Sequence, residues 1–191
     1  MYILGISGSP RKGGLSDSLL EGALDGARSE GCHVEKIVLS DLDIRPCQDC
    51  GGCADTARCV IRDGMDTVRA EIELADGIII ASPIYFGSIT AQLKAAIDRH
   101  QDAWVAKYVL KNAPHRHKAK KGVFLCIAGE DKARYFANAK EIITAFFATL
   151  GIEYSGELFL GASEALLNDD LRRDEAMKRA FELGSSLARS L

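Results

Sequence analysis

Short apolar segments alternate with helical segments along the whole sequence, and this alternation limits the possible fold more than any other feature. Strands are expected at 2–6, 34–39, 77–80, 123–128 and within 152–160, and helices at 16–30, 65–75, 90–99, 133–150 and 172–191. Such alternation predicts a parallel sheet with right-handed helical crossovers. The run 77–80 is apolar throughout, which is typical of a central strand covered on both faces. We therefore predict a doubly wound α/β fold.

Two segments depart from the minimal alternation, and the length of the chain leaves room for both. At 191 residues we expect one domain over residues 1–191. The first choice of strand order is the flavodoxin-like 2-1-3-4-5 in a five-stranded sheet. The segment 40–63 holds a run of cysteines, and we expect a cysteine-rich loop at 44–64, inserted after the second strand. The segment 101–121 has no predicted role in the sheet.

Charge and hydropathy exclude several classes of partner. The formal net charge of −3 argues against nucleic acid. No apolar run approaches the roughly 20 residues of a spanning helix, so no membrane is expected. Residues 1–5 resemble a strand rather than a signal peptide. We therefore expect the cytoplasm, where thiols are free, metal-bound or catalytic rather than bridged.

The segment after the first strand is rich in glycine and hydroxyl groups and leads into a helix. Backbone N–H groups and the positive end of a helix dipole converge at such a turn, which suits a phosphate group. The spacing matches neither the dinucleotide fingerprint nor the P-loop. The alternative is a simple capped helix with Ser16 or Asp17 as N-cap. The candidate phosphate ligands are Ser7, Ser9, Arg11, Lys12, Ser16 and Ser18.

The segment after the third strand carries aromatic residues and a glycine. The first and third strands flank the crevice where ligands bind in the assumed strand order, so this segment should face the phosphate loop. An aromatic loop there can support a flat ring by stacking. The alternative is that both aromatic side chains pack on the core. The candidate ring-binding residues are Pro83, Ile84, Tyr85, Phe86 and Gly87.

Four of the six cysteines lie within thirteen residues, in the pattern Cys47-x2-Cys50-x2-Cys53-x5-Cys59. Three thiolates at two-residue gaps can surround one compact cluster, and a fourth can close it from a longer excursion. Structural zinc also takes four cysteines, but usually as two separated pairs. Free or regulatory thiols are the third possibility.

Taken together, these motifs resemble one group of proteins. The phosphate loop Gly8–Ser9–Pro10–Arg11, the 83–87 loop and the cysteine run are similar to those of the iron–sulfur flavoprotein subgroup of the NADPH-dependent FMN reductase superfamily. Leu15 stands where the superfamily often has a polar residue. The resemblance implies FMN and a [4Fe-4S] cluster held by Cys47, Cys50, Cys53 and Cys59. It also implies a homo-oligomer (dimer or tetramer) in which the cluster approaches the flavin of a neighbouring subunit, with a ferredoxin-like electron donor and acceptors that include oxygen or peroxide.

Three functions remain open from the sequence. The first is an electron-transfer flavoprotein with both cofactors, and the second an NAD(P)H-dependent FMN or quinone reductase with structural or redox-sensing cysteines. The third is a non-catalytic zinc or redox-sensor module. No protein acid or base is expected to be catalytic. The basic run 115–121 is either a docking site for an acidic ferredoxin or a solvated loop.

Overall fold

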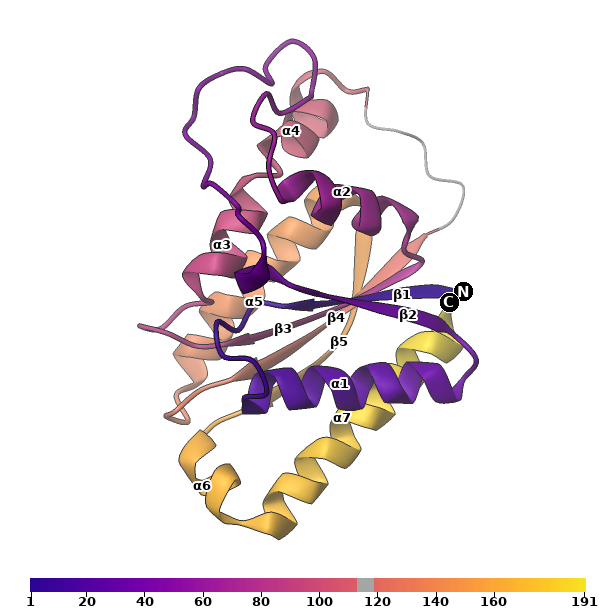
Figure 1. The fold of residues 1–191 in the computed structure, drawn as a ribbon, viewed down its shortest axis with the longest axis vertical. Helices are drawn as coiled ribbons and strands as arrows, with labels where there is room; N and C mark the ends of the chain where they lie inside the picture. The colour runs from indigo at the N-terminus through magenta and orange to yellow at the C-terminus, as the bar shows by residue number, and fades with distance from the viewer. Residues whose placement is uncertain (113–118) are drawn as a thin grey trace.

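The computed structural model describes residues 1–112 and 119–191. Within them, five parallel strands form one sheet in the order β2-β1-β3-β4-β5, which confirms the predicted order (Figure 1). The strands are β1 (Tyr2–Ser7), β2 (His33–Val38), β3 (Gly77–Pro83), β4 (Lys120–Ile127) and β5 (Ile152–Leu160). The register of β4 and β5 shifts between Gly122 and Val123.

Helices cover both faces of this sheet. On one face lie α1 (Leu15–Ser29) and α7 (Asp170–Ser190), which cross each other (Figure 1). On the other face lie α2 (Met65–Leu74), α3 (Ala91–Asp98) and α5 (Ala133–Leu150). Gly151 ends α5 in the left-handed region, at φ 68°, a conformation that glycine adopts easily. Within the described residues, none of the helices combines the length and apolarity needed to cross a membrane.

Four short elements were not predicted from the sequence. They are the 3-10 helix η1 (Leu39–Asp41), α4 (Gln101–Trp104), the π-helical turn η2 (Val105–Val109) and α6 (Ser163–Asn168). Each spans at most about two turns, which is too short for a helical repeat of apolar residues to stand out. Of these, α4 and η2 lie next to the cysteine loop (Figure 1).

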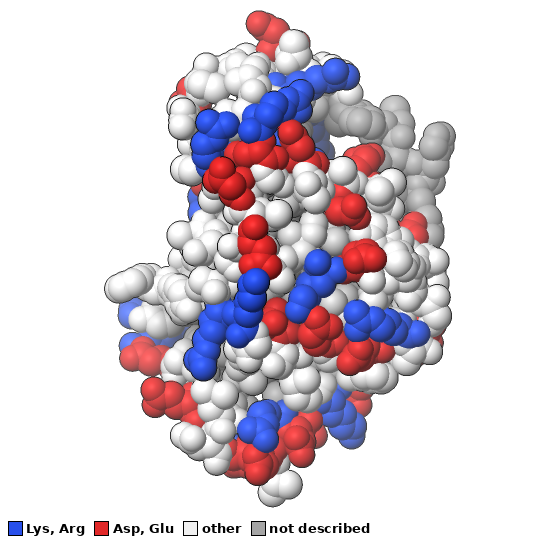
Figure 2. All heavy atoms as spheres, in the orientation of Figure 1, with Lys and Arg blue, Asp and Glu red and all other residues white. Residues whose placement is uncertain are grey.

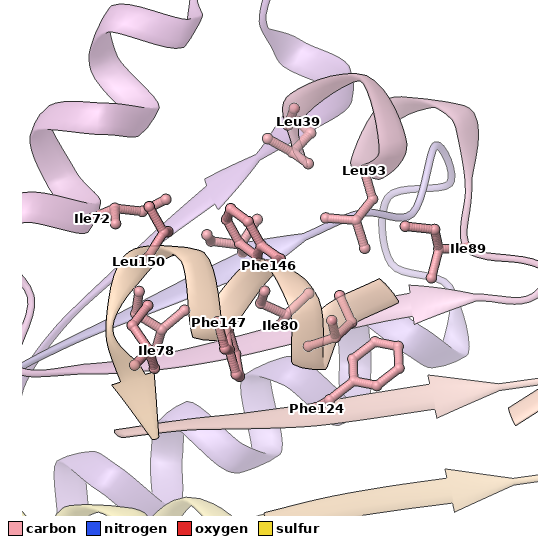
Figure 3. Close-up of a cluster of buried hydrophobic side chains, with 14 of the residues drawn as sticks. Leu39, Ile72, Ile78, Ile80, Ile89, Leu93, Phe124, Phe146, Phe147 and Leu150 are labelled. Atoms are coloured by element: carbon pink, nitrogen blue, oxygen red, sulfur yellow. The ribbon is translucent and has the colours of Figure 1, made fainter. Parts of the chain in front are cut away.

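Alternate residues of each central strand fill two separate apolar layers. Ile78, Ile80 and Phe124 face α2, α3 and α5. They pack there in one cluster with Phe146 and Phe147 of α5 (Figure 3). The intervening residues of β3 and β4 face α1 and α7 instead. Successive side chains of a strand point to opposite faces, so a strand covered on both sides must be apolar at every position. This arrangement accounts for the uninterrupted apolar run of β3.

The register places the loops that follow β1 and β3 next to each other. Ser7, the last residue of β1, pairs with Ala81 of β3. In contrast, the segment after η1 turns away from the sheet and packs beside α4, at the top of Figure 1. The fold therefore presents two separate regions: the neighbouring loops at the carboxyl ends of β1 and β3, and a hollow under the cysteine loop.

Candidate functional site

The helix α1 begins without a side-chain cap. Its N-cap is Gly14, which makes no side-chain capping hydrogen bond. Ser16 and Asp17 lie inside the first turn, so the expectation that either one is the N-cap is wrong. The Asp17 carboxylate instead accepts the backbone N–H of Gly13 at 3.1 Å. The first N–H groups of a helix have no intrahelical acceptor, and an anion can bind to them.

Hydroxyl groups line the start of this loop. The Ser7 and Ser9 side chains are buried, and the Ser9 hydroxyl bonds to the backbone of Arg11. The Ser7 hydroxyl is close enough to Asp17 to help lower the pKa of that carboxyl, yet it completes no hydrogen bond of normal geometry within the described residues. A buried hydroxyl without a partner is unusual in a folded protein, and a ligand oxygen can satisfy it.

Charges are balanced around the phosphate loop. Burial alone would raise the pKa of Asp17, but the Gly13 N–H and the Lys36 ammonium lower it below its usual value. Lys36 lies 3.2 Å from Asp17 and 2.6 Å from Glu21. Arg11 is exposed, and Lys12 is paired with Asp41 at 2.7 Å. Since Asp17 is already neutralised by Lys36, its charge does not dominate the anion site.

Thr90 connects the two loops, a contact that sequence reasoning missed. Its hydroxyl donates to the carbonyl of Gly8 at 2.5 Å and accepts the N–H of Leu93 at 3.3 Å, which caps α3. Gly8 also donates its own N–H to Ala81 at 2.8 Å. A Cβ at Gly8 would lie 2.9 Å from that of Leu93, so only glycine fits there. A threonine before an amphipathic run is an N-cap signal that could have indicated this residue.

The loop after β3 is a tight hairpin with its aromatic side chains in solvent. Tyr85 and Ser88 exchange backbone hydrogen bonds, and the two residues between them have positive φ, 51° at Phe86 and 79° at Gly87. Phe86 is fully exposed and Tyr85 is about half exposed, at 47%. The alternative that these aromatic side chains pack on the core is therefore wrong. A non-glycine residue held in the left-handed region is uncommon, and such strain often marks a functional loop.

Side chains of α5 support this hairpin from behind. The Asn138 amide donates to the carbonyl of Gly87 at 2.9 Å, and the Tyr135 ring lies against the same glycine. Pro83 is the last residue of β3, and the N–H of Ile84, which follows it, donates to the carbonyl of Ile127 at 2.7 Å. Neither Asn138 nor Tyr135 carries a sequence signal, because their role depends on the approach of a helix distant in sequence.

All four clustered cysteines line one hollow of about 220 Å³. Cys47 and Cys50 are exposed, and Cys53 and Cys59 are partly buried. The remaining wall comes from Arg99 and from α4 with its neighbours, including Asp102 and Trp104. Burial, and then the nearby Asp102 carboxylate, raise the pKa of the Cys53 thiol. A thiol of this kind loses its proton when it coordinates a metal.

The size of the hollow distinguishes between kinds of bound metal. Its volume is several times the roughly 30 Å³ that one water occupies, so it has room for more than one atom. Among the described residues, no three His, Cys, Asp or Glu side chains are close enough together to hold a single metal ion. Four thiols around a wide hollow fit a polynuclear cluster better than they fit zinc, which needs thiolates at about 2.3 Å.

The cysteine hollow and the loops after β1 and β3 have different lining residues. The residues that line the hollow come from the cysteine loop and from 99–105, and they include none from the phosphate loop or the 83–87 hairpin. The physical reason is that the residues after η1 extend away from β2 before the first cysteine.

The basic run 115–121 is only partly described. His115 to Lys118 lie outside the described residues. Lys120 is buried, and its ammonium group donates to the carbonyls of Ile72 and Glu73 at the end of α2. Lys121 donates to Ser190. A docking role for Lys120 is therefore wrong, because its charge serves the carboxyl end of a helix.

Comparison with known proteins places these observations in a family. Residues 1–142 match the family model described as NADPH-dependent FMN reductase. The chain is 31% identical, over 98% of its length and 79% of the other, to an iron–sulfur flavoprotein of Archaeoglobus fulgidus. The chain belongs to the iron–sulfur flavoprotein group of the NADPH-dependent FMN reductase family.

A second curated protein and a solved structure are also similar to this chain. An iron–sulfur flavoprotein of Methanosarcina thermophila is 42% identical over 112 residues, but the match spans only 59% of either chain. Among solved structures, a flavone reductase superposes with a TM-score of 0.75 at 25% identity, covering all of this chain and 62% of that one. The sequence-based resemblance to the family is confirmed.

Proposed function

We propose that this protein is an electron-transfer flavoprotein that binds FMN between the β1 and β3 loops and a [4Fe-4S] cluster on its four clustered cysteines. FMN supplies one- and two-electron chemistry and the cluster supplies one-electron chemistry. The observation that carries the proposal is the gathering of Cys47, Cys50, Cys53 and Cys59 around one hollow in a member of this flavin-binding family.

The phosphate of FMN is assigned to the uncapped start of α1. The N–H groups of its first turn, with Ser16 and Ser18, would bind the phosphate, and Ser7 and Ser9 would add hydroxyl groups. Arg11 and Lys12 contribute positive charge. We assign the ring to Pro83, Ile84, Tyr85, Phe86 and Gly87, where an exposed aromatic hairpin can cover a flat face.

The assignment of Arg11 has a direct test. Replacing Arg11 by Ala removes a charge-assisted contact to phosphate, so the preference for FMN over riboflavin should fall about tenfold. Titration calorimetry on the flavin-free protein measures both affinities. The control is Arg28→Ala, which removes an arginine from the carboxyl end of α1, the helix that follows the loop of Arg11; Arg28 pairs there with Asp25. Equal losses for FMN and riboflavin would contradict a phosphate contact.

The cofactor assignment is tested by analysis of protein purified without oxygen. We expect one flavin with about four irons and four sulfides per chain. Flavin without iron would favour a reductase whose cysteines are structural or redox-sensing, and zinc without flavin would favour a sensor module. Either result overturns the proposal.

The finer parts of the proposal concern partners. We propose a ferredoxin-like donor, an acceptor that includes oxygen or peroxide, and a cytoplasmic homo-oligomer. The lining of the cysteine hollow includes no residue of the flavin loops, and we propose that in the oligomer each cluster approaches the flavin of a neighbouring copy. Positive and negative side chains alternate on the face in Figure 2, so that face has no broad basic surface for an acidic donor.

The second candidate function is an NAD(P)H-dependent FMN or quinone reductase, and the family match favours it. Stopped-flow mixing separates the two. Rapid bleaching of the flavin by NADPH or NADH, with slow bleaching by reduced ferredoxin, would support the reductase. The reverse order of rates supports the electron-transfer protein.

A further inference from the structure

A buried arginine lies under the cysteine loop. Arg99 caps the carboxyl end of α3, is only 1% exposed, and lines the same hollow as the four cysteines. A guanidinium keeps its charge in a protein. Burying such a charge is unfavourable unless it is paired and hydrogen-bonded. The partners of Arg99 therefore indicate what this position does.

Those partners come from both ends of the cysteine loop. Nη1 of Arg99 donates to the carbonyl of Arg45 at 2.7 Å and to the carboxylate of Asp63 at 2.6 Å. Nη2 donates to the carbonyl of Ile61 at 3.1 Å. Arg45 lies two residues before Cys47, and Ile61 lies two residues after Cys59. One planar side chain thus joins the two ends of the segment that carries all four thiols.

Asp63 completes this closure. Its side chain is 3% exposed, and it also accepts the backbone N–H groups of Arg45 at 3.1 Å and Met65 at 3.0 Å. Burial alone would raise the pKa of Asp63, but Arg99 and these N–H groups hold it at about 2. The carboxylate therefore stays ionised.

One N–H group of Arg99 does not bond to Asp63 or to the two loop carbonyls. Its Nε is buried and completes no hydrogen bond within the described residues. Arg99 and Cys59 line the same hollow, and Arg99 is buried there. The positive charge of the guanidinium therefore faces the site that Cys59 helps to form, and burial strengthens its field.

We propose that Arg99 is the positioning residue of the cluster site. It closes the loop 45–63 before a cluster binds, and it holds a positive charge beside Cys59 that favours the reduced cluster, which carries one more negative charge. The identity of the cluster rests on the function proposed above, whereas closure of the loop does not.

Three substitutions separate closure from charge. Arg99→Gln removes both the charge and the fork-shaped set of donors. Arg99→Lys keeps the charge but places its three N–H donors on one nitrogen, so it loses the planar fork that reaches Arg45, Ile61 and Asp63 from two nitrogens. Asp63→Asn keeps the charge of Arg99 and removes the negative charge beside it. The matched control is Arg62→Gln in the same segment, whose side chain is 73% exposed and contacts Asp66.

Closure is measured on the protein without iron, by hydrogen exchange of the amides in 45–63. Opening of the loop should speed exchange at least about tenfold in Arg99→Gln and Arg99→Lys, since both variants lose the forked bonds to the carbonyls of Arg45 and Ile61. Arg62→Gln should exchange like the unmodified protein. Unchanged exchange in both Arg99 variants would overturn the closure role.

The charge effect is measured as the midpoint potential of the reconstituted cluster, followed by electron paramagnetic resonance. Arg99→Gln should lower the potential, Arg99→Lys should leave it near that of the unmodified protein, and Asp63→Asn should raise it. If Arg99→Gln does not load, the other two variants carry the test. An unchanged or lowered potential in Asp63→Asn would overturn the charge role. An unmodified protein that binds no iron would instead overturn the proposed function, while the exchange result would still decide closure.

Discussion

His100 is a buried imidazole that the fold keeps neutral. Its Nδ1 lies 2.9 Å from the carbonyl of Ala96, its ring packs edge-on against Phe146, and its Nε2 has no partner within the described residues. Burial lowers its pKa to about 4; the Ala96 carbonyl opposes this, and the charge of Arg69 adds to it. The ring therefore ionises on unfolding at a pH where it stays neutral in the folded protein.

This difference predicts a pH dependence of stability. The folded pKa lies below the unfolded value of about 6.5, so the unfolded state binds more protons between pH 6.5 and 4. The free energy of unfolding should fall by roughly 3 kcal/mol across this window, at 1.36 kcal/mol per pKa unit. Urea unfolding at several pH values measures it. This fall in the free energy of unfolding should be much smaller in His100→Leu and unchanged in His33→Gln, which alters an exposed histidine. A fall of the same size in His100→Leu would contradict the assignment to His100.

Thr90 predicts a second effect at a single residue. Thr90→Val keeps the shape but removes the cap of α3 and the bond to Gly8. We expect a loss of about 1–2 kcal/mol in the free energy of unfolding and weaker retention of FMN. Thr90→Ser keeps the hydroxyl and should retain FMN. Thermal unfolding and flavin release on dialysis are the measurements; normal retention in Thr90→Val would exclude a link between the two loops.

Among the elements, α1 and α7 approach each other more closely than ordinary side chains allow. A Cβ added at Gly184 would lie 1.8 Å from the carbonyl oxygen of Ala23, and one at Gly26 would lie 2.0 Å from that of Phe181. The glycines therefore let the two helix backbones touch where they cross (Figure 1). This contact holds the carboxyl-terminal helix on the sheet.

Gly184→Ala should force the two helices apart. We expect the free energy of unfolding to fall by at least about 1–3 kcal/mol, the usual range for overpacking. Gly129→Ala is the control, because a Cβ there meets nothing within 4 Å. Equilibrium unfolding in urea compares them. Equal stability of the two variants would mean that the helices shift without loss of packing.

The long elements could be predicted from the sequence because their periodicity is local. The limits of β1, α1, α2 and α5 differ from prediction by at most one residue. The site is different: its residue types were visible, but their partners were not. Arg99 and Thr90 act on residues 36 and 82 positions away, and no local pattern encodes such contacts. The closure of the cysteine loop depends on the same kind of distant contact, so the sequence showed its cysteines but not the residues that hold its ends together.

At the scale of the whole molecule, the two candidate sites are built from different parts of the chain. Cys53→Ala should therefore abolish the iron content while leaving FMN affinity within about twofold, because sites without shared partners act independently. Iron analysis and flavin titration on the same sample measure both. Ala54→Ser, at the neighbouring position in the same loop, is the control. Loss of FMN together with iron would indicate that the sites depend on each other.

The closure of the cysteine loop by Arg99 has a consequence for how such proteins diversify. Arg99 holds the two ends of the loop together, so a change in loop length between them need not move the sheet. Each doubling of loop length costs only about 0.6 kcal/mol of closure entropy. Insertions and deletions between the third and fourth cysteines should therefore be tolerated. The cysteine loop of related proteins can therefore vary in length, or be lost, without a change in the sheet or in the loops that follow β1 and β3.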